Sequence, residues 1–365
     1  MAMPEYNWKC TQKTCLVRDE LLQHVNANSR RFGWHATNYT FLWGMTLEDG
    51  IKYRLGTFKP HSLVQSMTSL RIRDVSDVPT TFDARKEWPS YVHPILDQGN
   101  CGSSWALSTA SVAADRLTLH SQGAYSDMLS AQQILDCDID YKQKGCEGGH
   151  LDRAWWYMRT IGVVSEPCYP YNSAITQVRG KCSLPRYMMR LSATSCPSGS
   201  RGLKSPVYQV APPYKISPNE KEIMKEIMEN GPVQALMHVK EDFFLYKNGV
   251  YHHSLPADFL PPNRHKTGYH SVKILGWGTD YSTGKPLKYW LCANSWGLEW
   301  GERGYFRILR GVNESEIESF IIGVWGKVNG RELRRHNRRT SLRQRLRHSR
   351  RRLRHRRHLM RRWRS

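Results

Sequence analysis

The chain has 365 residues, 39% of them hydrophobic and 11% aromatic, which is enough for one large domain or two of ordinary size with buried cores. No run of about 18 apolar residues occurs, so no transmembrane helix is expected. The polar first residues also lack the apolar stretch of a signal peptide. The net charge of +22 lies mostly in residues 331–365, which hold 17 Arg and one acid, Glu332, whereas the rest is only mildly basic.

The cysteine content indicates an oxidising compartment. Nine cysteines are many for a chain of this size, although their number is odd. Two N-glycosylation sequons begin at Asn38 and Asn313. A sequon alone is weak evidence, because chance matches are common. Cysteines and sequons together predict a secreted, extracellular glycoprotein.

The first quarter of the chain gives weak structural signals. Residues 1–30 are polar and contain Cys10 and Cys15. Residues 32–60 mix aromatic side chains with glycine, which predicts extended or irregular structure. Residues 61–80 resemble a linker that ends at Val78-Pro79.

The clearest helix signal covers residues 104–120, where apolar side chains recur at helical spacing. Because Gly102-Ser103 precedes it, position 104 is expected at a helix N-terminus. Shorter helices are expected over residues 127–137, 151–160 and 219–229. After Pro232, short apolar runs alternate with turns, as β-strands do. Helices followed by strands predict an α+β fold.

The tail from residue 329 to residue 365 is expected to be disordered, because its like charges repel and it offers little apolar area. Such a tail suits binding to polyanions: nucleic acid, heparin-like glycans or an anionic membrane surface. An extension with no selected role is an equal alternative, since composition alone does not separate these readings.

Three short segments carry the chemistry, and they lie far apart in the sequence: Gln98-Gly-Asn-Cys-Gly-Ser-Ser-Trp105, Gly268-Tyr-His-Ser-Val272 and Asn294-Ser-Trp-Gly297. The first resembles the nucleophile signature of papain-like cysteine peptidases at every position except the nucleophile, where Ser104 stands. A cysteine nucleophile works as a thiolate, whose pKa an imidazolium and a helix N-terminus lower.

The resemblance assigns four positions of a catalytic site: Gln98, Ser104, His270 and Asn294. Asn294 would orient the His270 imidazole, and the Gln98 side chain with the backbone N–H of residue 104 would form the oxyanion hole. Ser104 as a working nucleophile is the less favoured reading, because a serine hydroxyl is far less acidic than a thiol. The alternative is that Ser104 only caps its helix.

The resemblance to cathepsin B-like peptidases of this family covers about residues 78–328. It rests on motifs spread along the chain: Val78–Arg85, Gly145–Gly149, Gly276–Gly278, Trp300–Ile308 and, upstream, the propeptide-like Trp34–Asn38 and Gly56–Phe58. A more specific likeness is to the tubulointerstitial nephritis antigen family, which also carries Ser at the nucleophile position. That family would have Cys where Ser315 stands, and it lacks the Arg-rich tail.

The resemblance implies a two-lobed papain-like fold, with a helical left lobe and a β-barrel right lobe. It divides the chain into a remnant of a Cys-rich region (1–30), a propeptide-like segment and linker (31–77), the peptidase-like domain (78–328) and the tail (329–365). It also implies the disulfides Cys101–Cys146, Cys137–Cys182 and Cys168–Cys196, with Cys292 as a buried free thiol.

The implied function is that of a secreted, catalytically inactive homologue, located in basement membranes, that binds extracellular matrix proteins or cell-surface receptors. Gly148 and Gly149 would line a retained cleft able to hold a peptide by strand addition, and Trp296 would shield the His–Asn bond. The alternative is a weak hydrolase using Ser104, His270 and Asn294. No cofactor or metal is expected, because His252-His253 lacks zinc-like spacing.

Overall fold

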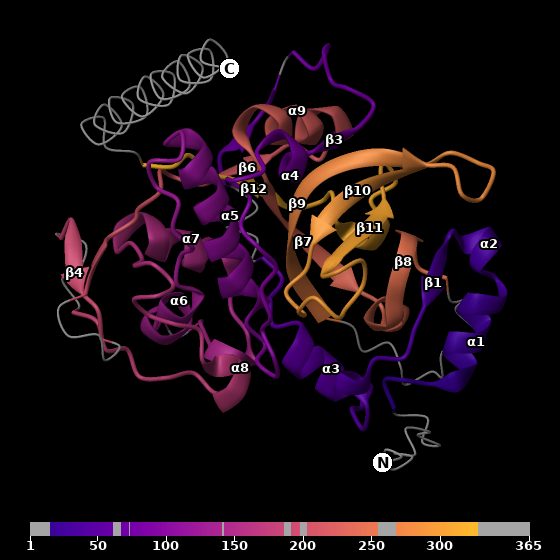
Figure 1. The fold of residues 1–365 in the computed structure, drawn as a ribbon, viewed down its shortest axis with the longest axis horizontal. Coiled ribbons are helices and arrows are strands. Elements are labelled where there is room, and N and C mark those ends of the chain that lie inside the picture. The colour runs from indigo at the N-terminus through magenta and orange to yellow at the C-terminus, as the bar shows by residue number, and fades with distance from the viewer. Residues whose placement is uncertain are drawn as a thin grey trace, which may run out of the picture.

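The computed structural model describes residues 15–60, 67–72, 74–140, 142–185, 191–197, 203–254 and 268–327. These residues form two lobes side by side, one helical and one built around a curved sheet (Figure 1). The predicted Arg-rich tail lies outside the described residues. In the part that is described, no helix is long and apolar enough to cross a membrane.

The helical lobe is built around α5, which runs from Ser104 to His120 as the apolar spacing predicts. The described residues of this lobe also form α6 (Ala131–Cys137), α7 (Leu151–Thr160) and the short α8 (Ser173–Thr176). The helix expected from residue 127 begins later because the Ser130 hydroxyl accepts a hydrogen bond from the Gln133 N–H, 2.9 Å away, and caps it there. The lobe also carries a hairpin of β4 (Ala193–Ser195) and β5 (Lys204–Pro206).

The described residues of the second lobe form a sheet of ten strands, which is mostly antiparallel. Along the sheet the strands are β1 (Trp34–Ala36), β8 (Tyr246–Tyr251), β11 (Tyr305–Leu309), β10 (Leu287–Ala293), β9 (Gly268–Asp280), β7 (Val233–Val239), β12 (Ile321–Gly323), β6 (Tyr214–Ile216) and β2 (Ser69–Leu70), with β3 (Phe82–Asp83) paired to β9. Helix α9 (Glu220–Asn230) belongs to this lobe. The α+β class and the division into a helical lobe and a sheet lobe are confirmed. However, hydrogen bonding among the described strands forms an open path from β1 to β2, so it does not close the expected barrel.

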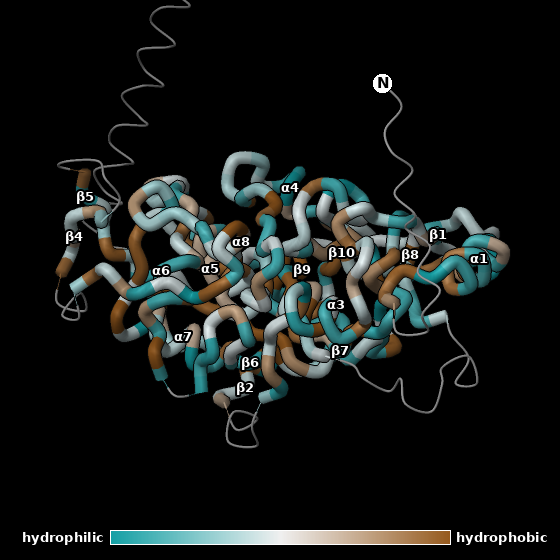
Figure 2. The backbone as a smooth tube through the Cα atoms, turned by 90° about the horizontal axis from the view of Figure 1, so that it is seen from below, coloured by the Kyte–Doolittle hydropathy of each residue, from teal (hydrophilic) through white to brown (hydrophobic). Residues whose placement is uncertain are grey.

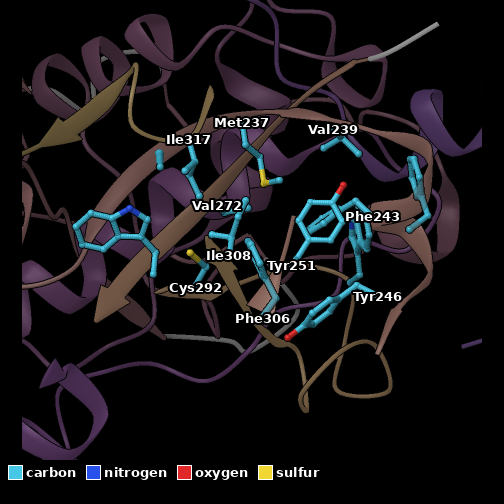
Figure 3. Close-up of a cluster of buried hydrophobic side chains, with 14 of the residues drawn as sticks. Met237, Val239, Phe243, Tyr246, Tyr251, Val272, Cys292, Phe306, Ile308 and Ile317 are labelled. Carbon is cyan, nitrogen blue, oxygen red and sulfur yellow. The ribbon is translucent and has the colours of Figure 1, made fainter. Parts of the chain in front are cut away.

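The sheet encloses an aromatic core. Phe243, Tyr251 and Phe306 turn toward one another in Figure 3, with Cys292 and Val272 beside them. The Phe243 ring lies 5.0 Å from the rings of both Tyr251 and Phe306, each in an edge-to-face arrangement. Cys292 is free and buried, as predicted.

The residues before position 60 are more regular than the sequence indicated. They form α1 (Asp19–Ala27), α2 (Ser29–Phe32), β1, a 3₁₀ turn (Thr40–Leu42) and α3 (Leu47–Arg54), where extended or irregular structure was expected over 32–60. The missed signal for α3 is a capping box, in which Thr46 and Asp49 bond each other's backbone N–H. Elements α1 and β1 lie at the end of the molecule away from the helical lobe (Figures 1 and 2).

The three predicted disulfides are confirmed, and all lie in the helical lobe: Cys101–Cys146, Cys137–Cys182 and Cys168–Cys196. The first joins the loop before α5 to the glycine loop at residues 145–149. It therefore fixes two segments that border the candidate site.

Candidate active-site cleft

Ser104 is the first residue of α5 and is fully buried. The helix-capping role that the sequence allowed for it is not observed, because Ser103 occupies the N-cap position. The Ser103 hydroxyl makes no cap bond and instead lies 2.7 Å from the Tyr171 hydroxyl. The Ser104 hydroxyl instead contacts Thr57 Oγ1 and the Ser271 N–H.

His270 and Asn294 meet as the resemblance implies. His270 lies near the start of β9, and Asn294 directly follows the neighbouring strand β10. His270 Nε2 is 2.7 Å from Asn294 Oδ1, and both residues are buried. The Trp296 ring lies 5.1 Å from the imidazole, and its Nε1 donates to the Arg54 carbonyl at 2.6 Å. Trp296 therefore covers the His–Asn pair and also holds the end of α3.

Gln98 and the Ser104 N–H, the two expected oxyanion-hole donors, converge on one atom of the same chain. Gln98 Nε2 lies 3.3 Å from the Leu55 carbonyl oxygen, and the Ser104 N–H donates to that oxygen at 3.4 Å. Gln98 Nε2 also donates to the carbonyls of Cys101 at 2.9 Å and Tyr53 at 3.1 Å. The Leu55 carbonyl thus accepts from both groups that the family resemblance assigns to an oxyanion hole.

The residues after Leu55 pass between the two lobes, and Thr57 forms an isolated β-bridge to each side, with Gly149 and with Tyr269. The Gly149 N–H donates to the Gly56 carbonyl at 2.9 Å, and the Phe58 N–H donates to the Gly149 carbonyl at 2.9 Å. On the other side, the Thr57 N–H donates to the Tyr269 carbonyl at 3.2 Å. Residues 55–58, called here the cleft strand, are therefore held by the helical lobe through Gly149 and by the sheet lobe through Tyr269. Helix α3, which leads into this strand, lies across the lobe junction in Figure 1.

Glycines make this close fit possible. Gly56 has a φ of +98°, and a Cβ there would lie 2.0 Å from the Gly102 carbonyl oxygen. A Cβ on Gly148 would lie 2.6 Å from the ring of Phe58. Gly148 and Gly149 therefore border a peptide, as expected, but that peptide is the chain's own cleft strand.

The electrostatics of the site differ from those of a thiolate–imidazolium pair. Burial lowers the pKa of His270 to about 4, partly opposed by Asn294 and the nearby Leu55 carbonyl, so the ring is neutral at pH 7. The Ser104 hydroxyl lies 2.8 Å from Thr57 Oγ1 and accepts from the Ser271 N–H at 3.4 Å. Within the described residues it makes no hydrogen bond to His270, whose Nδ1 has no partner there. The serine and its candidate base are thus near but not coupled.

Sequence reasoning missed Leu55, Thr57 and Tyr269. The motif Gly56-Thr57-Phe58 was noticed, but its partner Gly149 lies far along the chain, and no local pattern reports that pairing. The remaining predicted positions lie apart from the cleft. Asn313 is exposed, whereas Asn38 is half-buried and accepts from Trp43 Nε1 at 2.5 Å.

No group of three His, Cys, Asp or Glu within the described ranges is placed to hold a metal ion. His253 instead faces the buried Asp242 carboxylate, with Nδ1 3.1 Å from Oδ1. The carboxylate partner raises the pKa of His253 against the opposing effect of burial.

The chain is similar to papain-family proteins over most of its length. Residues 78–324 match the family described as papain family cysteine protease. Human tubulointerstitial nephritis antigen-like is 48% identical over 340 residues, covering 90% of this chain and 72% of that protein. Bovine tubulointerstitial nephritis antigen is 48% identical over 328 residues, covering 88% and 68%. Cathepsin B-like cysteine proteinase 4 of Caenorhabditis elegans is 37% identical over 277 residues, covering 69% and 76%.

Solved structures give the same fold. ProCathepsin B S9 from Trypanosoma congolense superposes with a TM-score of 0.71 at 27% identity, covering 86% of this chain and 99% of that one. Digestive procathepsin L2 from Tenebrio molitor superposes with a TM-score of 0.66 at 25% identity, covering 84% and 89%.

Proposed function

The chain belongs to the papain family of cysteine proteases, and we propose that it is a non-catalytic member of that family. In this proposal it is secreted, lies in basement membranes and binds extracellular matrix proteins or cell-surface receptors. The observation that carries the first part is the position of the Leu55 carbonyl, which both oxyanion-hole donors already hold.

Two features support the absence of catalysis. The cleft strand uses the backbone groups of Gly149 that a bound peptide would need. Ser104 also lacks the low pKa of a thiol and would need a base in contact with its hydroxyl, yet that hydroxyl faces Thr57. The alternative, a weak hydrolase of Ser104, His270 and Asn294, requires both the strand to leave and the serine to turn toward His270.

Support for an extracellular binding role comes from the disulfides and from the relatives of the chain. Three disulfides suit an oxidising compartment. The two relatives that are 48% identical are named as tubulointerstitial nephritis antigens, and the family resemblance links such proteins to basement membranes. Because its own strand fills the cleft, the chain would contact a partner through its outer surfaces.

The catalytic question can be tested by emptying the cleft. Replacing Gly56 by leucine forces a side chain into the Gly102 carbonyl, which lies 2.0 Å from the added Cβ, so the cleft strand must move out. We expect no turnover of fluorogenic dipeptide substrates by the wild type or by Gly56→Leu. The double variant Gly56→Leu/Ser104→Cys should gain turnover, because Gln98, His270 and Asn294 remain in place.

The matched control is Gly56→Leu/Ser104→Ala, which removes the hydroxyl and sets the background. Turnover by Gly56→Leu that disappears in this control would contradict the proposal and support the serine hydrolase. A silent Gly56→Leu/Ser104→Cys variant that still folds would mean that the site has lost more than its nucleophile.

The binding role can be tested on a surface coated with basement-membrane proteins. We expect the full chain and a chain lacking residues 331–365 to be retained equally, because the globular part carries the proposed contacts. Retention should be measured at 50 and at 200 mM salt, since binding through many arginines weakens steeply over that range. Retention that needs the tail and is lost at the higher salt would instead assign the chain to polyanion binding.

A further inference from the structure

We propose that Ser104 is a latch: its hydroxyl holds Thr57 and so keeps the cleft strand permanently seated between the lobes. In this role the residue at the nucleophile position is a binding residue for the chain's own peptide. The inference goes beyond the matrix-binding proposal and does not depend on it.

The latch is a buried hydroxyl pair. Ser104 Oγ and Thr57 Oγ1 are 2.8 Å apart, and the two residues are 0% and 4% exposed. Among the described residues, Thr57 Oγ1 has no hydrogen-bond partner other than Ser104 Oγ. A buried hydroxyl without a partner is costly, so each hydroxyl depends on the other. The Ser271 N–H, 3.4 Å from Ser104 Oγ, completes the environment of the serine.

Oxygen suits this contact better than sulfur. A hydroxyl is a strong donor and acceptor, and a separation of 2.8 Å is ordinary for two oxygens. A thiol is a weak donor and a weak acceptor with a larger atom, so a cysteine at position 104 would crowd Thr57 and bind it poorly. The serine therefore gives position 104 a bond that the cysteine of an active peptidase would not provide.

The Ser104–Thr57 bond lies where a single bond can help to hold the whole cleft strand in place. Thr57 is flanked by the two residues that pair with Gly149, and its own N–H donates to Tyr269 on β9. The bond to Ser104 thus lies in the middle of the strand, and it must break before the strand can leave. Phe58 extends the contact, with its ring 5.1 Å from that of His150.

Amide hydrogen exchange of the full chain tests the latch, with the Thr57 and Phe58 N–H groups as reporters. We expect Ser104→Ala and Thr57→Val each to accelerate exchange at these amides about tenfold, the usual weight of one such hydrogen bond on a local opening. Because both substitutions remove the same bond, the double variant should exchange little faster than either single variant.

The matched control is Thr118→Val, which removes another buried hydroxyl of α5 that bonds only within the helix, to the Ala114 carbonyl at 2.8 Å. It should leave exchange at residues 57 and 58 unchanged. Unchanged exchange in Ser104→Ala would overturn the proposal, and so would effects that simply multiply in the double variant. Equal acceleration at the amides of β10 would also overturn it, because the whole fold rather than the strand would then be opening.

Discussion

Replacing Arg116 by methionine is expected to lower the free energy of unfolding by about 3–5 kcal/mol, because the change leaves a buried carboxylate without its cation. Arg116 lies on α5 with none of its side chain exposed, and its Nη2 is 2.9 Å from Glu226 Oε1 on α9. Within the described residues its other hydrogen bonds run to the Tyr214 hydroxyl and to the carbonyls of Pro232, Val324 and Gly231.

The charge of Glu226 explains the size of this effect. Burial alone would raise the pKa of its carboxyl, but Arg116 and the Tyr214 hydroxyl together hold that pKa below its ordinary value. Without Arg116 the carboxylate would have to take up a proton or stay charged in an apolar site. Either outcome opposes folding at pH 7.

Chemical denaturation of Arg116→Met should be compared with Arg159→Met, a change to an exposed arginine of α7 that is expected to stay within about 0.5 kcal/mol of wild type. The double variant Arg116→Met/Glu226→Gln should recover part of the loss, because it removes the unpaired charge. An Arg116→Met variant as stable as Arg159→Met would show that the ion pair does not hold the lobes together.

Replacing Trp34 by alanine is expected to cost about 3–5 kcal/mol and to release the residues before the cleft strand. Trp34 is fully buried, and its ring lies 5.2 Å from that of Tyr251 in the core of the sheet lobe. Strand β1, which carries it, also pairs with β8. The N-terminal segment therefore shares one core with the sheet lobe rather than resting on its surface.

Denaturation and limited proteolysis together check this expectation. In Trp34→Ala, cleavage should begin within residues 15–60 while the rest of the chain resists. The control Trp34→Phe keeps most of the apolar area and removes an indole N–H that has no partner in the described part of the structure. It should therefore cost much less than Trp34→Ala, about 1 kcal/mol for the smaller cavity. Unaltered protease resistance in Trp34→Ala would mean that other contacts anchor the segment.

The contacts of Arg116 and Trp34 both help to keep residues 55–58 seated between the two lobes. The Arg116 network joins the lobes on one side of α5, and the Trp34 core anchors the segment that supplies the cleft strand. Gly56 and Gly102 then let backbone meet backbone where the strand passes the start of α5. The cleft strand is therefore held by the anchored segment that precedes it, by its backbone bonds to Gly149 and Tyr269, and by the Ser104–Thr57 bond.

Much of the molecule was accessible from local sequence patterns. The period of the apolar residues placed α5, and Gly102-Ser103 placed its start, because both signals depend on residues within a turn or two. The family resemblance gave the three disulfides, the buried Cys292 and the positions of His270 and Asn294. The helices before residue 60 were missed, although the capping box at Thr46 was a local signal for one of them.

The sequence by itself determined that position 104 carries a hydroxyl at a helix N-terminus, and the family resemblance implied that Gln98, His270 and Asn294 lie beside it. Only the tertiary structure decided what that hydroxyl contacts, because its partner Thr57 is 47 residues away in the sequence. Strand addition leaves little trace in a sequence, because it uses backbone groups that nearly every residue possesses. Neither Gly56 nor Gly149 therefore indicates its partner. In the sequence, position 104 indicates a missing nucleophile. In the fold, the same residue is hydrogen-bonded to the chain's own segment between the lobes.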